Sequence, residues 1–146
     1  MKRVKEILDS KGYDVWTIAP DESVLEAIKL MAEKGIGALI VAEGDSGADH
    51  VVGIVTERDY ARKVILQGRA SRETPIREIM TSPVICTHPG RSAEECMAIM
   101  TDKRVRHLPV IEDDNLVGLI SIGDLVKSII DHQQFVIEQL ESYITG

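Results

Sequence analysis

The same sequence pattern occurs twice along the chain, and this internal repeat restricts the fold more than any other feature. Residues 15–23 align with residues 84–92, and residues 52–59 align with residues 117–124. The spacing between the copies changes within the Gly- and Asp-rich residues 43–50. We expect this segment to be a loop, because loops tolerate changes in length better than helices and strands do.

Each copy predicts the same order of elements, β-α-β-β-α. Ser23 and Ser92 each precede a Glu by three residues, which is the pattern of a capping box at the start of a helix. In the first copy this helix is expected over residues 24–34, where the apolar residues form one stripe. Gly35 is expected to end the helix.

Two strands and a second helix follow in each copy. In the first copy the strands are expected over residues 37–42 and 51–55, and the second helix is expected to begin at Glu57. In the second copy the hairpin loop is shorter, over residues 112–115, and the second helix is expected to begin at Ile122. The sequence therefore predicts an α+β fold in which two β-α-β-β-α units pack on one another.

A short apolar segment precedes each copy, over residues 4–8 and 76–80, and we expect it to form a helical lead-in. The predicted organisation is a first repeat with its lead-in helix, a polar connector, a second repeat and a C-terminal helical extension. These four parts span residues 1–68, 69–75, 76–131 and 132–146.

Composition excludes several classes of protein. The chain has 146 residues, 44% of them hydrophobic, which is enough for an aliphatic core without disulfides. Its formal net charge of −7 argues against nucleic acid or an anionic membrane as a partner. No apolar run reaches the roughly 18 residues of a membrane span. The polar residues 1–6 do not resemble a signal peptide, so we expect a cytoplasmic protein.

The sequence contains no familiar catalytic or metal-binding motif. Cys86 and Cys96 lack the spacing of a zinc site and are expected to pack as reduced, small apolar residues. The four histidines are scattered, and neither a Walker A loop nor a Gly-x-Gly-x-x-Gly pattern occurs. We therefore expect no metal, no catalytic residue and no enzymatic activity.

Each copy ends its second strand in a hydroxyl residue followed by an aspartate, Thr56-x-x-Asp59 and Ser121-x-x-Asp124. One interpretation is a helix cap and nothing more. The other is a ligand site, because free N–H groups lie at a helix start and a carboxylate there can accept bonds from two neighbouring hydroxyls, as on a ribose. Both interpretations hold together if the hydroxyl caps while the aspartate faces outward.

The two copies differ where the first strand of the hairpin begins. Residues 35–38 are small and apolar in the first copy, whereas residues 104–107 read Arg-Val-Arg-His in the second. One interpretation is a solvated start of a strand. The other is a site for an anionic group, because Arg106 can bind a phosphate through parallel N–H bonds and His107 can assist it.

The paired units, the Gly-x-x-Thr/Ser-x-x-Asp strand ends and the run over residues 104–110 resemble a tandem pair of cystathionine-β-synthase (CBS) domains. The resemblance covers roughly residues 4 to 130. It implies two CBS repeats related by pseudo-two-fold symmetry, which bind adenosine-containing compounds in two clefts between the repeats. AMP, ADP, ATP, NAD(H) and S-adenosylmethionine are the ligands that it implies, without a metal.

The resemblance also implies which residues line each cleft. The aspartate of one repeat is expected to bind the ribose, while the first strand and strand start of the other hold base and phosphate. The first set is Thr56, Arg58, Asp59, Thr87, Val105, Arg106 and His107. The second set is Thr17, Ile18, Ile36, Gly37, Ala38, Ser121 and Asp124. The second set lacks the basic strand start, which puts its affinity for phosphate in doubt.

The helical pattern continues after Asp124 without a counterpart in the first copy. It predicts a helix about 30 Å long with an apolar stripe. The stripe comprises Leu125, Ile129, Val136, Leu140 and Tyr143 or Ile144. It forms either a dimer contact or a surface that packs back on its own chain, and the homodimers that the resemblance implies favour the former.

The sequence therefore predicts a non-catalytic, homodimeric sensor of an adenosine-containing small molecule. It would signal to a regulated protein that the sequence does not name, with no nucleic acid or membrane partner. The alternative is a ligand-free interaction or dimerisation scaffold whose clefts are vestigial.

Overall fold

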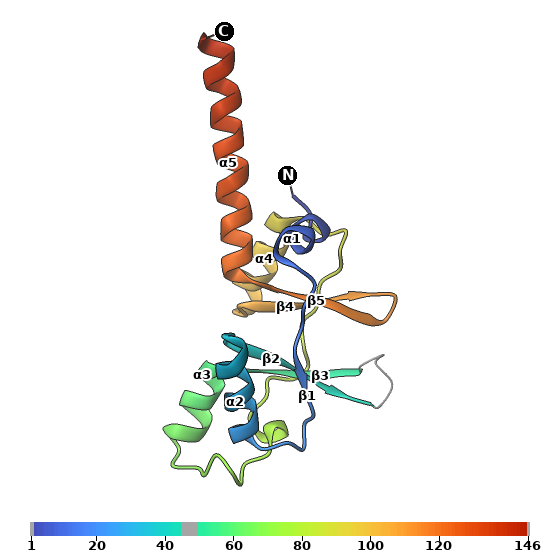
Figure 1. Cartoon of the computed structure of the whole chain (residues 1–146), viewed down its shortest axis with the longest axis vertical. Coiled ribbons are helices and arrows are strands. Elements are labelled where there is room, and N and C mark those ends of the chain that lie inside the picture. The colour runs from blue at the N-terminus through green and yellow to red at the C-terminus, as the bar shows by residue number, and fades with distance from the viewer. Residues whose placement is uncertain (1, 45–49, 146) are drawn as a thin grey trace. The chain divides into compact units, whose positions relative to one another are not determined.

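The structure is a computed structural model of the whole chain, and it describes residues 2–44 and 50–145 (Figure 1). The interior of the loop expected over residues 43–50 lies outside the described residues. The chain divides into two compact units, which we call unit A and unit B. Unit A comprises residues 15–85 and 113–116, and unit B comprises residues 1–14, 86–112 and 117–146.

Unit A contains a three-stranded sheet in the order β1-β2-β3. β1 (Thr17–Ile18) pairs in parallel with β2 (Ala38–Glu43), which pairs antiparallel with β3 (His50–Thr56). α2 (Val24–Lys34) lies between β1 and β2 in the chain. The strands expected over 37–42 and 51–55 are thus confirmed to within one residue at each end.

Three short helical segments complete unit A. α3 (Glu57–Tyr60) follows β3 directly, as predicted, and a π-helical segment, η1 (Ala61–Ile65), continues it. η2 (Ile76–Glu78) is a 3-10 turn. These elements enclose an aliphatic core of Val24, Ala27, Met31, Leu39, Val41, Val55, Val64, Ile76 and Ile79.

Unit B repeats this plan with differences at both ends. α4 (Ala93–Lys103) corresponds to α2, and β4 (His107–Glu112) and β5 (Asn115–Ser121) form a two-stranded sheet. A parallel bridge between Thr87 and Val110 takes the place of β1. α1 (Val4–Lys11) and the 24-residue α5 (Ile122–Thr145) complete the unit.

Local sequence signals account for the ends of the matching helices. The Ser23 hydroxyl accepts the Glu26 N–H at the start of α2, and Ser92 forms a reciprocal capping box with Glu95 at the start of α4. α2 ends at Gly35, whose φ of 66° is left-handed, as expected of a helix C-cap. Arg104 takes the same conformation at the end of α4, with φ 57°.

Each unit takes its lead-in segment from the other sequence repeat. In unit B, Leu8 of α1 covers Gly118 of β5 so closely that a Cβ on Gly118 would lie 2.8 Å from Leu8 Cδ2. In unit A, Met80 covers Gly53 of β3, where a Cβ would lie 2.5 Å from Met80 Sδ. The first glycine of each Gly-x-x-Thr/Ser-x-x-Asp motif is therefore required by packing, and the boundary between units differs from the boundary between repeats.

The C-terminal helix is longer than expected. With 24 residues at about 1.5 Å each, α5 spans about 36 Å, and Figure 1 shows it extending well past the rest of unit B. Its buried residues are Leu125 and Ser128. The expectation that Leu125 lies on the outer stripe is therefore wrong, because this side chain is fully buried in unit B. Among the described residues, no helix combines the length and apolar character needed to cross a membrane.

Candidate functional site

Asp59 lies in the first turn of α3, at the end of β3, where its carboxylate forms a capping box. Oδ2 accepts the backbone N–H and the hydroxyl of Thr56, at 3.0 and 3.1 Å, while the Thr56 hydroxyl accepts the Asp59 N–H at 3.2 Å. The second oxygen, Oδ1, lies 3.2 Å from Lys63 Nζ, one turn further along. The capping interpretation of this motif is thus confirmed, and it fixes the direction of the carboxylate.

Asp124 occupies the matching position in the first turn of α5. Its Oδ2 accepts the Ser121 N–H at 2.8 Å, and the Ser121 hydroxyl accepts the Asp124 N–H at 3.1 Å. The same Oδ2 lies 2.6 Å from Lys11 Nζ, which also donates to the Leu119 carbonyl at 2.8 Å. Within the part of the chain that the structure describes, Oδ1 of Asp124 makes no hydrogen bond or ion pair.

The hydrogen bonds to Asp124 outweigh the effect of its burial. Burial alone would raise the pKa of Asp124, but the bonds from Lys11 and Ser121 hold that pKa below its ordinary value of 3.8. The carboxylate is therefore ionised at neutral pH, as a group that accepts hydrogen bonds from ribose hydroxyls must be.

The basic strand start lies beside this carboxylate within unit B. The Arg106 carbonyl accepts the N–H of Ile122, the first residue of α5, at 2.9 Å, which ties the start of β4 to the start of α5. Arg106 is exposed and His107 is half-buried. Burial lowers the pKa of His107 below 6.5, the Asp124 charge opposes this, and Lys11 and Arg106 lower it further. His107 is therefore mostly neutral at pH 7.

In unit A, the structure brings residues of both predicted sets together. Ala38 of the second set pairs with Thr56 of the first across β2 and β3, and the Gly37 carbonyl accepts the Glu57 N–H at 3.0 Å. Thr17 and Ile18 pair with the middle of the same strand β2. Arg58 is exposed on α3, next to Asp59. The strand starts and helix starts of this unit thus form one continuous edge.

Thr87 lies in the interior of unit B. It is 4% exposed, and its hydroxyl lies 3.3 Å from the Cys96 Sγ. Burial raises the pKa of both Cys86 and Cys96, so neither thiol is readily ionised. The backbone of Thr87 pairs with the middle of β4, where it donates to the Pro109 carbonyl and accepts the Ile111 N–H, each at 2.9 Å.

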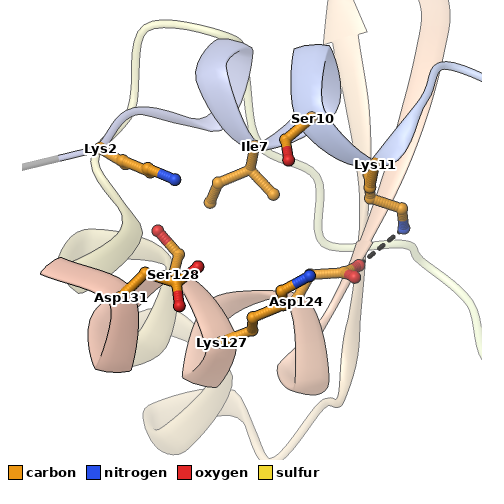
Figure 2. Close-up of a pocket in the computed structure, with 8 residues that line it drawn as sticks. All are labelled: Lys2, Ile7, Ser10, Lys11, Asp124, Lys127, Ser128 and Asp131. Atoms are coloured by element: carbon orange, nitrogen blue, oxygen red, sulfur yellow. Dashed lines mark hydrogen bonds and ion pairs between the residues drawn. The ribbon is translucent and has the colours of Figure 1, made fainter. Parts of the chain in front are cut away.

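A small pocket of about 100 Å³ lies beside Asp124 in unit B, between α1 and α5 (Figure 2). Lys2 and Lys11 line it from the N-terminal segment, and Asp124, Lys127 and Asp131 line it from α5. Binding sites for whole nucleotides enclose roughly 300–1,000 Å³. This pocket therefore has room for one polar group of a ligand, and not for a nucleotide.

Four interacting residues were not anticipated from the sequence. Lys63 is four residues after Asp59 on one helical segment, so the ordinary helical pairing rule could have found it. Trp16 next to β1 carries Lys34 Nζ over its ring, 4.2 Å from the centroid. Lys11 gave no local signal, because it comes from the opposite end of the chain to its partner Asp124.

Among the described residues, no three His, Cys, Asp or Glu side chains are grouped so that they could hold a metal ion. The candidate groups are one capped aspartate in unit A, and a second capped aspartate beside a basic strand start in unit B. They offer hydrogen-bond acceptors for hydroxyls and cations for an anionic group.

The sequence profile of the CBS domain matches residues 4–65 and again residues 76–131. The chain belongs to the CBS-domain family. The two matches span both repeats and confirm the resemblance seen in the sequence. The mixed arrangement of helices and strands in two CBS repeats confirms the predicted fold class.

Relatives include proteins of similar size. CBS domain-containing protein CBSX3, mitochondrial, of Arabidopsis thaliana is 37% identical over 98% of this chain and 72% of its own length. A solved structure described as a candidate signal-transduction protein with CBS domains, from Burkholderia ambifaria, is 54% identical with a TM-score of 0.83. It covers 90% of this chain and 96% of that chain.

One solved relative holds ligands. The CBS domain pair of protein MJ0100, in complex with 5'-methylthioadenosine and S-adenosyl-L-methionine, is 26% identical with a TM-score of 0.78. The match covers 90% of this chain and 98% of that chain. A CBS pair of this fold therefore binds adenosine-containing compounds in at least one relative.

Proposed function

We propose that this CBS pair is a non-catalytic regulatory module that binds an adenosine-containing compound and signals to a protein partner. The observation that carries the proposal is the repeated geometry at Asp59 and Asp124. In each repeat a strand ends at a hydroxyl residue that caps a helix, and hydrogen bonds within that cap hold the aspartate in place. The ligands of the MJ0100 pair support adenosine as the recognised group.

The first set has the groups that a nucleoside phosphate requires. We assign the ribose to Asp59, with Thr56 and Arg58 beside it, and the phosphate to Arg106 and His107. Val105 offers apolar contact to the base, and the buried Thr87 supports β4 through its backbone. AMP, ADP or ATP fits this set best, because an arginine binds phosphate through charge-assisted hydrogen bonds.

The second set is chemically different. We assign the ribose to Asp124 and Ser121, and the base to Thr17, Ile18, Ile36, Gly37 and Ala38. Lys11 supplies a cation beside this aspartate that the sequence comparison between repeats does not reveal. NAD(H) or S-adenosylmethionine are ligands that we assign to this set in preference to a triphosphate.

The energetics are consistent with micromolar binding. A dissociation constant near 1 µM requires about −8 kcal/mol. One or two charge-assisted bonds to phosphate contribute about 1.5–3 kcal/mol each, to which bonds to ribose add. Burial of adenine against aliphatic side chains offsets the cost of immobilising the ligand.

The assignment of the first set is tested by calorimetric titration of AMP into two variants. Asp59→Glu keeps the capping box, because Glu is the usual residue at that position, but displaces the carboxylate by one methylene. Arg106→Gln removes the proposed phosphate contact. We expect each to weaken binding about tenfold or more. Arg104→Gln, which removes the neighbouring charge at an exposed position, is the control and should bind as the wild type does.

The single tryptophan of the chain gives a separate readout for the second set. Trp16 directly precedes Thr17, so a ligand held by the second set should change the fluorescence of Trp16, whereas a ligand held by the first set should not.

In the calorimetric test, wild-type isotherms for both Asp59→Glu and Arg106→Gln would overturn the assignment of the first set.

The alternative function is a ligand-free scaffold for interaction or dimerisation. An absence of binding to every adenosine compound at millimolar concentration would favour it over the sensor. In either case we expect a homodimer, a regulated protein partner and a cytoplasmic location, although the relative CBSX3 is described as mitochondrial.

A further inference from the structure

The exposed side of α5 carries a regular apolar pattern. Successive positions alternate steps of four and three residues over six steps, which is the heptad spacing of helices that pack side by side. These seven positions are Ile122, Val126, Ile129, Gln133, Val136, Leu140 and Tyr143. Ile130, Ile137 and Ile144 each follow one of them directly, and they widen the stripe on one side.

This stripe faces away from unit B. The buried residues of α5, Leu125 and Ser128, occupy heptad positions outside the stripe. On the stripe, the exposed fraction is 42% for Val126, 57% for Ile130 and 58% for Leu140. Within unit B, the structure therefore does not show the tail packing back on the rest of the unit.

The second half of α5 has no support within its own unit. From Asp131 to Thr145 every residue is exposed except His132, which is half-buried. An isolated helix of about 12–15 residues is marginal in water, so packing of its apolar face normally stabilises it. The partner that covers this face therefore contributes to the stability of the helix itself.

The distribution of charged residues on α5 favours an identical helix over a charged peptide as its partner. Its five charged residues, Asp124, Lys127, Asp131, Glu138 and Glu141, all fall at two heptad positions outside the stripe. The two positions beside the heptad seam carry no Asp, Glu, Lys or Arg, and hold Gly123, Ile130, Ile137, Ile144, Leu125, His132 and Gln139. Two identical helices therefore meet without like-charge repulsion, whereas an acidic or basic peptide would find no charge to pair with.

Gln133 is the one polar residue within the stripe. Its amide has both donors and an acceptor, so it can pair with the same residue of an identical helix. A single polar residue at such a position fixes the register of paired helices at some cost in stability. An identical helix is therefore a compatible partner at every position of the stripe, Gln133 included.

We propose that this outer face of α5 is a self-association surface, on which α5 of a second copy of the chain packs as a helical bundle. The width of the stripe, three apolar positions in each heptad, is that of a bundle helix. This proposal names the surface through which the expected homodimer would form, and it does not depend on nucleotide binding.

Two substitutions at equally exposed residues test the proposal. Leu140 lies on the stripe and Phe135 lies off it, and each is 58% exposed. Leu140→Glu should raise the dissociation constant of the assembly, measured by sedimentation equilibrium without nucleotide, by about tenfold or more. Phe135→Glu places the same charge on the same helix and should leave the constant unchanged.

Three results would overturn the proposal. They are a wild-type chain that is monomeric at its solubility limit, an unchanged constant in Leu140→Glu, and an equal effect of Phe135→Glu. Because both side chains are exposed, neither variant disturbs the core of unit B. Circular dichroism provides a second readout, since dissociated Leu140→Glu should lose helical signal from the unsupported half of α5.

Discussion

The Nζ of Lys11 lies 2.6 Å from Oδ2 of Asp124 and thereby joins the last turn of α1 to the first turn of α5 (Figure 2). The bond lies within unit B, and Lys11 also donates to the Leu119 carbonyl at the end of β5. One oxygen of the proposed ribose acceptor is thus held by a residue from the other sequence repeat. The same contact links the lead-in helix, the strand end and the candidate site.

We expect Lys11→Met to lower the free energy of unfolding at pH 7 by about 1 kcal/mol or less, because both groups are partly solvated. The bonds from Lys11 and Ser121 keep the pKa of Asp124 below 3.8 in the folded state. This stabilisation is present above pH 3.8 and is lost as the pH falls through the lowered pKa. Urea unfolding at several pH values should therefore show the two proteins converging at low pH.

Lys5→Met is the matched control, because it removes the same charge from an exposed position on the same helix. It should leave the free energy of unfolding close to that of the wild type. A Lys11→Met deficit that stays constant down to pH 2 would show that lost packing, and not the ion pair, causes it.

His107 should titrate below pH 6.5 in the free protein, as followed by NMR. Burial, Lys11 and Arg106 lower its pKa and Asp124 raises it, so Lys11→Met should move the pKa upward. Since the folded pKa is depressed, the related stability is present above pH 6.5 and is lost as the pH falls through the folded pKa.

A phosphate bound beside His107 should raise the pKa of this side chain and so make AMP bind more tightly as the pH falls from 8 to 6. AMP itself also titrates in this range, so His107→Gln is the comparison that isolates the protein group. Identical pH profiles for the variant and the wild type would exclude His107 from the phosphate contact.

Gly118→Ala should destabilise the protein by about 1–3 kcal/mol, because the added methyl would overlap Leu8 in the fully buried interface between α1 and β5. Gly123→Ala is the control. Its Cβ would meet only the Ser121 Oγ at 3.6 Å, and Ala is preferred over Gly in a helix, so stability should rise slightly. Unfolding curves that place both variants on the same side of the wild type would contradict this packing.

A Leu8→Ala background provides an internal check on the same contact. There the methyl of Gly118→Ala should cost less, because the side chain that it overlaps has been shortened. Additive effects of the two substitutions would mean that Leu8 and Gly118 are not coupled.

Substitutions at the C-terminal ends of α2 and α4, at Gly35 and Arg104, should change the free energy of unfolding in opposite directions. Arg104→Gly should raise the free energy of unfolding by about 1 kcal/mol, because a left-handed conformation strains residues with a Cβ. Gly35→Ala should lower it by a similar amount, since its Cβ would meet no atom within 4 Å and only the backbone is strained. If thermal melting shows a loss for Arg104→Gly, the Arg104 side chain has a structural role of its own.

Local signals in the sequence predicted the helix starts at Ser23 and Ser92, the strand ends at Thr56 and Ser121, and the aspartates that follow them. These features depend on residues three or four positions apart, so the sequence of a single repeat is enough to predict them. The exchange of lead-in segments and the Lys11–Asp124 pair were not predictable in this way. They depend on packing between residues far apart in the chain, such as Leu8 on Gly118.

The helix α5 is longer than the sequence predicts for a related reason. The predicted stripe begins at Leu125, which belongs to the side of the helix that packs on its own unit. Counting from Ile122 and Val126 instead gives the exposed heptad pattern. The choice between the two faces required the burial of Leu125 and Ser128, which the sequence period alone does not supply.

The most direct test of the regulatory proposal is calorimetric titration of the full-length wild-type chain with AMP, ATP, NADH and S-adenosylmethionine. The account predicts saturable binding of at least one of them, weakened about tenfold or more in Asp59→Glu or in a matching Asp124→Glu variant. No heat with any of the four at millimolar concentration would contradict the account, and would leave a scaffold without a nucleotide site.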